Sequence, residues 1–295
     1  MSAPPSFSPG VQRVLRAISH LPLAVFRLAG AGLGVVLFAF ARRRRRIVVR
    51  NLELCFPQAS ALQRWRWAWQ TFKHFGQSFV DRVWVWNGPP ELVERRVQLA
   101  GDVAALADAT PVLLFVPHFF GMDAGWARLT QAIQRSWWTF YSPQGSPVMD
   151  AWVRQGRQRF GQPRLIPRHE GVRPLVKGLR AGAALCLLPD MDLGERDSVF
   201  VPFFGVLAAT VTSLPRLAKV AGVPVRPWVC RMVPGGYQVE VMDAWAGYPS
   251  GDDEADARTM NERLEDMIRT MPGQYHWLHR RFKSRPAGEP DVYQR

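Results

Sequence analysis

The stretch Pro111-Val-Leu-Leu-Phe-Val-Pro-His-Phe-Phe-Gly-Met-Asp123 indicates the fold and contains a candidate reactive group. Its apolar run, residues 112–116, predicts a buried strand. Pro117 cannot donate a hydrogen bond to a neighbouring strand, so the strand should end there. His118 follows directly, and Gly121 permits a tight turn into a helix expected over residues 124–133. Ligands of open α/β sheets bind outside the carboxyl ends of the strands, so His118 is predicted to lie in such a crevice.

His118 and Asp123 are a candidate catalytic pair. Five residues apart on one continuous helix, they would point roughly 140° away from each other. They can meet if the chain bends at the intervening Phe-Phe-Gly segment. A carboxylate on one imidazole nitrogen fixes the tautomer and makes the other nitrogen a better base. The alternative is a strand-end histidine bonded to an acid that caps the next helix, and spacing alone does not separate the two.

Composition restricts the kind of protein. The 295 residues suffice for one large α/β domain with additions or for two small domains. The net charge is +14 and comes mainly from arginine, which suits phosphorylated lipids, nucleic acid or acidic proteins as partners. Twelve tryptophans and seventeen phenylalanines suit a boundary between apolar and polar surroundings. Cys55, Cys186 and Cys230 are widely spaced, which indicates a reduced compartment without a zinc site or a disulfide framework.

An almost wholly apolar segment, residues 21–41, is followed at once by five arginines, Arg42 to Arg46. About 20 apolar residues can span a bilayer, and adjacent arginines favour its cytoplasmic side. Arg27 interrupts the segment near one end, where its stem can reach the interface. Because the charges follow the apolar segment, a cleaved signal peptide is rejected, and a buried soluble helix is the alternative. We therefore divide the chain into an N-terminal tail (1–20), a membrane anchor helix (21–41) and one large domain (42–290).

Strand and helix signals alternate from residue 111 to residue 242, which predicts an α/β fold with a mixed, mostly parallel sheet flanked by helices. A strand over residues 183–188 ends at Pro189, so Asp190 should also face the crevice. A helix over residues 149–160 carries Arg154 and Arg157 on one face. We further expect an amphipathic core helix over 63–86, a helix over 207–222, a hairpin over 223–242, a helix over 252–271, and a final helix or phosphate-facing segment over 274–286.

The remaining motifs favour one chemistry. The sequence has no GxSxG elbow, no phosphate-binding glycine loop and no metal-spaced cluster of histidines or cysteines. A histidine–acid pair without a nucleophile of the chain suits a general base that deprotonates a hydroxyl of the second substrate. Attack on a thioester also requires cationic groups or N–H donors for the oxyanion, which arginines such as Arg157 can supply. Together with a membrane anchor, these features point to acyl transfer onto a lipid.

Five blocks of the sequence then resemble a known family. His118-Phe-Phe-Gly-Met-Asp123 resembles the HX4D/E motif of membrane acyltransferases, and the wider pattern is similar to the bacterial lipid A late acyltransferases, the lauroyl/myristoyl transferases. The other blocks, in the same order as in that family, are Arg50-Asn-Leu-Glu-Leu-Cys-Phe-Pro57, Leu188-Pro-Asp-Met-Asp-Leu-Gly194, Val199-Phe-Val-Pro-Phe-Phe-Gly205 and Trp277-Leu-His-Arg-Arg-Phe-Lys283. The resemblance extends from the apolar segment to about residue 286.

The resemblance implies a glycerolipid acyltransferase-like fold and a reaction. The family transfers an acyl group from acyl carrier protein to a hydroxylated acyl chain of a phosphorylated glucosamine disaccharide. The implied partners are acyl carrier protein, a phosphorylated glycolipid or phospholipid acceptor and a membrane, with no nucleic acid. The implied donor is acyl-ACP or acyl-CoA, with no further cofactor and no metal. The implied location is the cytoplasmic face of the inner membrane of a Gram-negative bacterium.

Site roles follow from the same resemblance. His118 would be the general base, Asp123 its orienting acid, Asp190 the family's strand-end aspartate and Arg157 its arginine near the substrate phosphate or the oxyanion. Arg154 is a further candidate for substrate binding.

Two departures from the family leave the acceptor open. Many members have Glu at the position of Asp123, and Ser142 replaces a frequent arginine. The alternatives are the same chemistry on a lysophospholipid or an aminolipid, and a lipid-binding membrane protein without catalysis. Phe203 and Phe204 either line an acyl-chain pocket or pack in the core.

Overall fold

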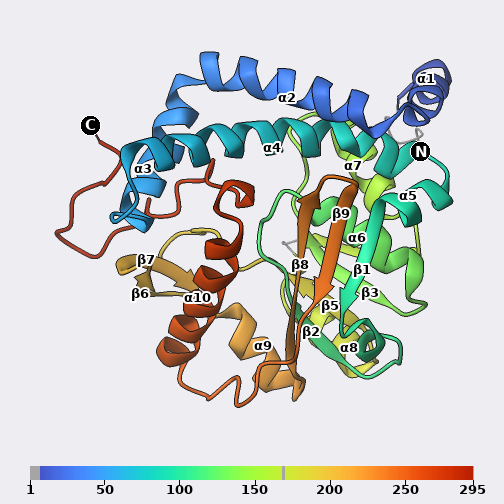
Figure 1. The fold of residues 1–295 in the computed structure, drawn as a ribbon. Coiled ribbons are helices and arrows are strands. Elements are labelled where there is room, and N and C mark those ends of the chain that lie inside the picture. Colours follow the sequence, from blue (N-terminus) through green and yellow to red (C-terminus); the bar gives the residue numbers. More distant parts are fainter. Residues whose placement is uncertain (1–6, 168–169, 295) are drawn as a thin grey trace.

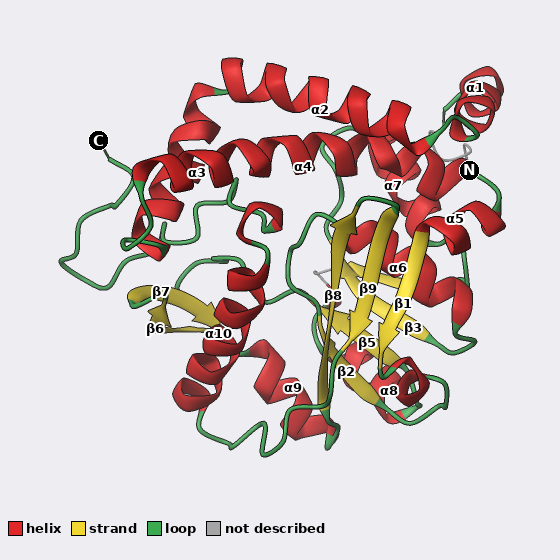
Figure 2. Cartoon of the chain, in the orientation of Figure 1, coloured by secondary structure: helices red, strands yellow, loops and turns green. Residues whose placement is uncertain are grey.

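The computed structural model describes residues 7–167 and 170–294. Figure 1 shows helices on both faces of a twisted sheet, with helices α2 and α4 side by side along one edge of the molecule. The larger sheet has seven strands and the smaller one is a two-stranded hairpin, β6–β7. Figure 2 shows this hairpin beside α10, apart from the larger sheet.

The seven-stranded sheet has the order β1-β9-β8-β2-β5-β3-β4. Strands β8 and β9 pair antiparallel and the other neighbours pair parallel. The predicted mixed, mostly parallel sheet is therefore confirmed. The strands are β1 (Val97–Gly101), β2 (Val112–Phe115), β3 (Trp137–Tyr141), β4 (Arg164–Pro167), β5 (Ala184–Leu187), β8 (Val225–Val233) and β9 (Gly236–Val241).

Strand β2 is apolar throughout because both of its faces are covered. Leu114 belongs to the hydrophobic cluster that includes residues of α6, whereas Leu113 and Phe115 belong to the cluster that includes residues of α8, α9 and α10. The helices are α5 (Pro90–Arg96), α6 (Met122–Ala132), α7 (Pro147–Arg157), α8 (Arg173–Arg180), α9 (Ser213–Ala221) and α10 (Asp253–Thr270). Two helix layers thus cover the sheet and leave its strand ends free for a site.

The hairpin β6 (Ser198–Phe203) and β7 (Val206–Val211) corrects the helix expected over residues 207–222, of which residues 213–221 form α9. Phe204 and Gly205 form the connection and both have positive φ, at 50° and 78°. A two-residue loop with two positive φ angles is a type I′ turn, which joins antiparallel strands. The Phe-Gly turn therefore continues the apolar block at 199–205 into a second strand. Strand β1 lies before residue 111, where we expected the alternation of strands and helices to begin.

The N-terminal half adds four helices: α1 (Pro9–Ser19), α2 (Leu23–Phe40), α3 (Arg42–Cys55) and α4 (Ala61–Asn87). Helix α1 lies within the segment that we expected to be a tail, and α2 lies within the expected anchor. Ser8 caps α1 by accepting a hydrogen bond from the backbone of Val11, and Ser60 caps α4 in the same way. Among the described residues, α2 is the one helix long and apolar enough to cross a membrane. After α10, Pro272–Gln274 forms a short 3₁₀ helix and the rest of the expected final helix is turns and loops.

Candidate active site

Two neighbouring parallel strands position His118. Strands β2 and β5 are in register, with Phe115 opposite Leu187. His118 lies three residues beyond Phe115, and Asp190 lies three residues beyond Leu187. Since parallel strands end at the same edge of a sheet, this register brings the two side chains together.

The imidazole of His118 is bonded to the carboxylate of Asp190. The distance from Nδ1 of His118 to Oδ1 of Asp190 is 2.7 Å, and the backbone N–H of His118 donates to Oδ2 at 2.9 Å. The Tyr275 hydroxyl donates to the same Oδ2 at 3.0 Å. Burial alone would raise the pKa of Asp190, but the interaction with the His118 imidazole and the hydrogen bonds from the side chain and backbone of His118 lower it to about 2. A charged Asp190 thus holds Nδ1 of His118, while Nε2 has no hydrogen-bond partner among the described residues.

The expected pairing of Asp123 with His118 is corrected by this geometry. Asp123 lies in the first turn of α6, where Arg157 donates from Nε to Oδ1 at 3.0 Å and Arg82 donates from Nε to Oδ2 at 2.9 Å. Burial would raise the pKa of Asp123, but Arg157 and Arg82 together lower it to about 2. The chain bends between His118 and Asp123 as expected, yet the bend directs the acid toward two arginines. Asp123 is therefore the carboxylate that holds an arginine pair.

Arg82 also lines the candidate site, although no pattern in the sequence predicts it. It comes from α4, whose aromatic spacing indicated a plain core helix, and its guanidinium stacks on the rings of Phe79 and Trp86. The side chains of Arg82 and Arg157 remain partly exposed, at 27% and 22%. Because Asp123 neutralises one of the two charges, the pair retains a net positive charge and free N–H donors.

These groups share one cavity of about 980 Å³ at the carboxyl ends of β2, β3 and β5. His118, Asp123, Arg82 and Arg157 all line it. Apolar side chains supply much of the remaining wall, among them Phe75, Phe79, Phe120, Val176, Leu188 and Leu193. A cavity with cations on an apolar wall fits a ligand that has both an anionic group and hydrocarbon chains.

A segment from the C-terminal part of the chain completes the wall of the cavity. Phe119 forms a bridge with Tyr275, and the backbone N–H of His276 donates to the carbonyl of His118 at 3.0 Å. His276 lines the cavity, and its burial, together with the charge of His118, lowers its pKa to about 3. His276 is therefore neutral at physiological pH. The contact that Tyr275 makes with Asp190 also escaped prediction, because no local pattern links residue 275 to the end of β5.

The other expected site residues lie elsewhere. Arg154 lies on α7 one turn before Arg157, and its guanidinium stacks over the ring of Tyr141 rather than lining the cavity. Phe203 is fully buried and packs against Phe204 and Phe282, and Phe204 is partly buried against the same hydrophobic cluster, so neither of these two residues lines the cavity. The three cysteines are free and buried. Within the described ranges, no three His, Cys, Asp or Glu residues are grouped to hold a metal ion.

The fold and this site define an α/β protein that can present an apolar, anionic ligand to a histidine at the edge of its sheet. The chain belongs to the bacterial lipid A biosynthesis acyltransferases, since the profile of that family matches residues 11–284. It is therefore an acyltransferase of lipid A biosynthesis.

Individual relatives agree with this assignment. The chain is 34% identical to the lipid A biosynthesis lauroyltransferase of Escherichia coli (strain K12), over 95% of this chain and 92% of that protein. It is 32% identical to the palmitoleoyltransferase of the same organism, over 93% and 90%. Among solved structures, the 1-acyl-sn-glycerophosphate acyltransferase of Thermotoga maritima is similar with a TM-score of 0.37 and 12% identity, over 84% of this chain and 97% of that chain.

Proposed function

We propose that this enzyme transfers a fatty acyl chain from acyl carrier protein to a hydroxyl of a lipid A precursor, at the cytoplasmic face of the inner membrane of a Gram-negative bacterium. The observation that carries the proposal is the His118–Asp190 pair, in which His118 lines the large cavity and its Nε2 has no hydrogen-bond partner within residues 7–167 and 170–294. Histidine 118 is the general base in this scheme.

The chemistry proceeds by direct transfer. Nε2 of His118 takes the proton of the acceptor hydroxyl while the hydroxyl oxygen attacks the thioester carbonyl of the donor. Asp190 stabilises the imidazolium that forms, as the carboxylate of a catalytic triad does. Collapse of the tetrahedral intermediate breaks the carbon–sulfur bond, and the imidazolium returns the proton to the departing thiolate. Cys186 lines the cavity, but burial raises the pKa of its thiol to about 12 and makes it a poor nucleophile, so the scheme uses no covalent acyl-enzyme.

The arginine pair binds negative charge in this proposal. Arg82 and Arg157 each donate hydrogen bonds to Asp123 with part of the guanidinium group. These bonds fix the planes of both groups before the substrate binds. Their remaining N–H groups can bind a phosphate of the acceptor, for which the planar guanidinium is well suited. The low pKa of Asp123 keeps its carboxylate charged, so the pair is held in place at every physiological pH.

The substrate assignment is tested by a mass-shift assay on the detergent-solubilised full chain. A phosphorylated tetra-acyl lipid A precursor and a lysophospholipid are offered in parallel, with acyl-ACP and acyl-CoA as alternative donors. The proposal predicts one added acyl chain on the lipid A precursor, with acyl-ACP as the better donor. Acylation of the lysophospholipid alone would replace the acceptor and retain the chemistry. No acylation of either would contradict the proposal.

A further inference from the structure

The apolar helix α2 lies along α4 with its backbone in contact. Gly30 and Gly34 face α4, where a Cβ added at Gly30 would lie 2.4 Å from Cα of Gln77, and one added at Gly34 would lie 2.8 Å from Cα of Lys73. From the other side, a Cβ on Gly76 would lie 2.2 Å from the carbonyl oxygen of Gly30. Small residues at matching positions on both helices permit this close antiparallel packing. The two helices therefore form one rigid pair.

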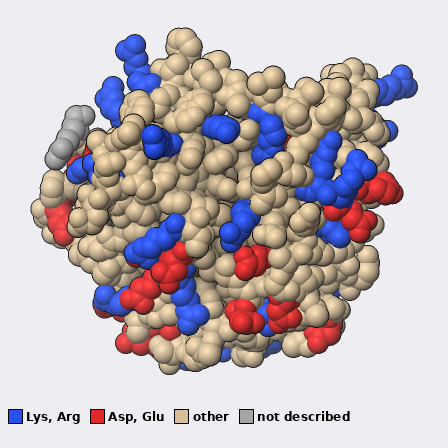
Figure 3. All heavy atoms as spheres, viewed as in Figure 1, with Lys and Arg blue, Asp and Glu red and all other residues tan. Residues whose placement is uncertain are grey.

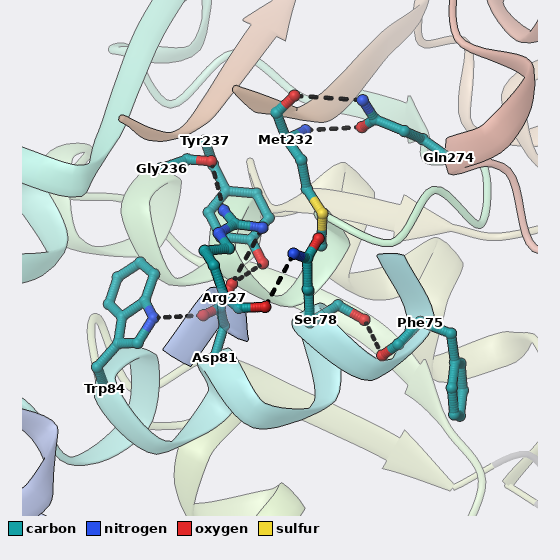
Figure 4. A network of polar contacts seen from close by, with 10 residues as sticks. Arg27, Phe75, Ser78, Asp81, Trp84, Met232, Gly236, Tyr237 and Gln274 are labelled. Carbon is teal, nitrogen blue, oxygen red and sulfur yellow. Dashed lines mark hydrogen bonds and ion pairs between the residues drawn. The ribbon is translucent and has the colours of Figure 1, made fainter. Parts of the chain in front are cut away.

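Arg27 connects α2 to the sheet and does not extend toward solvent. Its Nη2 donates to the carbonyl of Gly236 at 2.8 Å and its Nη1 lies 3.4 Å from Oδ2 of Asp81 (Figure 4). Asp81 is 1% exposed and also accepts hydrogen bonds from the Trp84 indole and the Tyr237 hydroxyl. This arrangement replaces the earlier expectation that Arg27 reaches for the membrane interface. If α2 moved away from α4, Asp81 would be left as a buried charge without its cation, which is strongly unfavourable.

Both ends of α2 are attached to the same domain. Before α2, the carbonyl of Leu21 accepts a hydrogen bond from Arg96 at 2.8 Å, and α1 packs on α4. After α2, α3 packs on α4, and Asn51 donates to the carbonyls of Trp277 and His279, both at 2.8 Å. A helix that crosses a bilayer has its ends about 30 Å apart on opposite sides. Helix α2 could cross only together with α4, whose charged residues oppose that.

The face of α2 that points away from α4 is apolar. Its exposed side chains are Val25, Leu28, Val35, Val36 and Phe40, and α1 adds Val11, Val14 and Ile18. Exposed arginines lie at both ends of this face: Arg13 and Arg16 on α1, and Arg42, Arg43, Arg44 and Arg46 on α3. In Figure 3, most acidic side chains of the view lie over its lower half, away from the edge that α2 forms. An apolar strip with cations at both ends matches the acyl boundary and the headgroups of an anionic lipid surface.

We propose that α2 does not cross the membrane but lies in the plane of one leaflet of an anionic bilayer, with its outer apolar face inserted and the flanking arginines at the headgroups. This inference rests on the membrane association in the proposed function, and it does not depend on the His118 chemistry. It places the amino-terminal helix α1 on the same side of the membrane as the catalytic domain. Because α4 supports α2 and also lines the cavity through Phe75, Phe79 and Arg82, a lipid can enter the cavity from that leaflet.

Depth measurements test the inference directly. The native cysteines are buried, so single cysteines placed by Leu21→Cys, Leu28→Cys, Val36→Cys and Phe40→Cys can be spin-labelled selectively. In vesicles of phosphatidylethanolamine and phosphatidylglycerol, the inference predicts similar shallow depths at all four positions, about 5–10 Å below the headgroups. A label at Lys177→Cys on α8 should remain in water. A depth that reaches the bilayer centre at Leu28 and Val36 and returns to the interface at Phe40 would overturn the inference.

Labelling from one side gives a second readout that does not require activity. With a membrane-impermeant maleimide and vesicles of uniform orientation, Arg13→Cys on α1 and Ala287→Cys in the catalytic domain should react from the same side. Reaction from opposite sides would refute the in-plane arrangement and leave the acyltransferase proposal intact. Failure of the full chain to bind these vesicles at all would refute both the in-plane arrangement and the proposed membrane association.

Discussion

The two aspartates of the site have similar burial and similarly low pKa values but different partners. Asp190 holds the imidazole of His118, and Asp123 holds the guanidinium groups of Arg82 and Arg157. This division gives each acid a separate role that single substitutions can distinguish. Loss of the Asp190 charge should affect proton transfer, whereas changes around Asp123 should affect the binding of an anionic acceptor.

Arg82 tests the second role. Arg82→Gln removes one charge-assisted hydrogen-bond donor from the cavity, so the KM for the phosphorylated acceptor should rise on the order of tenfold or more, with a smaller effect on kcat. Arg82→Lys retains the charge without the planar fork and should restore part of the affinity. The KM for a dephosphorylated acceptor should change little. Equal increases for both acceptors would show that Arg82 has a structural role alone.

The low pKa values of Asp123 and Asp190, both about 2, predict how stability depends on pH. Each folded pKa lies below the ordinary value near 4, so each acid stabilises the fold fully above about pH 4, and that stabilisation is lost as pH falls toward about 2. Each contributes on the order of 2 kcal/mol. Thermal unfolding of Asp123→Asn should therefore show a weaker loss of Tm than the wild type below about pH 4. Parallel curves for the two proteins would contradict this.

At the scale of helices and strands, the contact of α2 with α4 makes a prediction with a matched control. Gly34→Ala places a Cβ 2.8 Å from the Lys73 backbone, so the helices must separate and Tm should fall. Gly32 lies in the same helix, and a Cβ there meets nothing within 4 Å. Gly32→Ala should therefore stabilise α2 by up to about 1 kcal/mol and raise Tm slightly. Equal shifts of Tm in the two variants would show that the close packing is absent.

The packing of helices and strands also explains which features the sequence could predict and which it could not. Strand β2 was predictable because its unbroken apolar run reflects burial on both faces, and the positions of His118 and Asp190 at the sheet edge were predictable because each follows a strand. Their pairing was not predictable, because it depends on β2 and β5 being neighbours in register. Arg82 and Tyr275 were missed because each comes from an element distant in sequence and reaches the site through tertiary packing. Strand β7 was mistaken for a helix because the Phe204–Gly205 turn was not recognised.

For the molecule as a whole, the net charge of +14 affects how fast the acyl donor associates with the enzyme. If the donor is an acidic carrier protein, complementary charge accelerates its association with this enzyme, and salt screens that attraction. Raising the salt concentration should therefore increase the KM for acyl-ACP more than the KM for a neutral acyl-thioester donor. Measurement of both over a salt series, at a fixed acceptor concentration, decides the point. An unchanged KM for acyl-ACP would contradict electrostatic steering.

The most direct test of the His118–Asp190 mechanism is the single-turnover rate of acyl transfer in His118→Ala, Asp190→Asn and Asp192→Asn, each corrected for its folded fraction. Asp192 is the matched control, since it is a buried acid two residues from Asp190 that bonds to Gly194 and Ser284 and not to His118. We expect His118→Ala and Asp190→Asn to slow transfer by about 10² or more while acceptor binding persists, and Asp192→Asn to transfer at nearly the wild-type rate. Wild-type transfer rates in His118→Ala or in Asp190→Asn would contradict a general-base role for this pair.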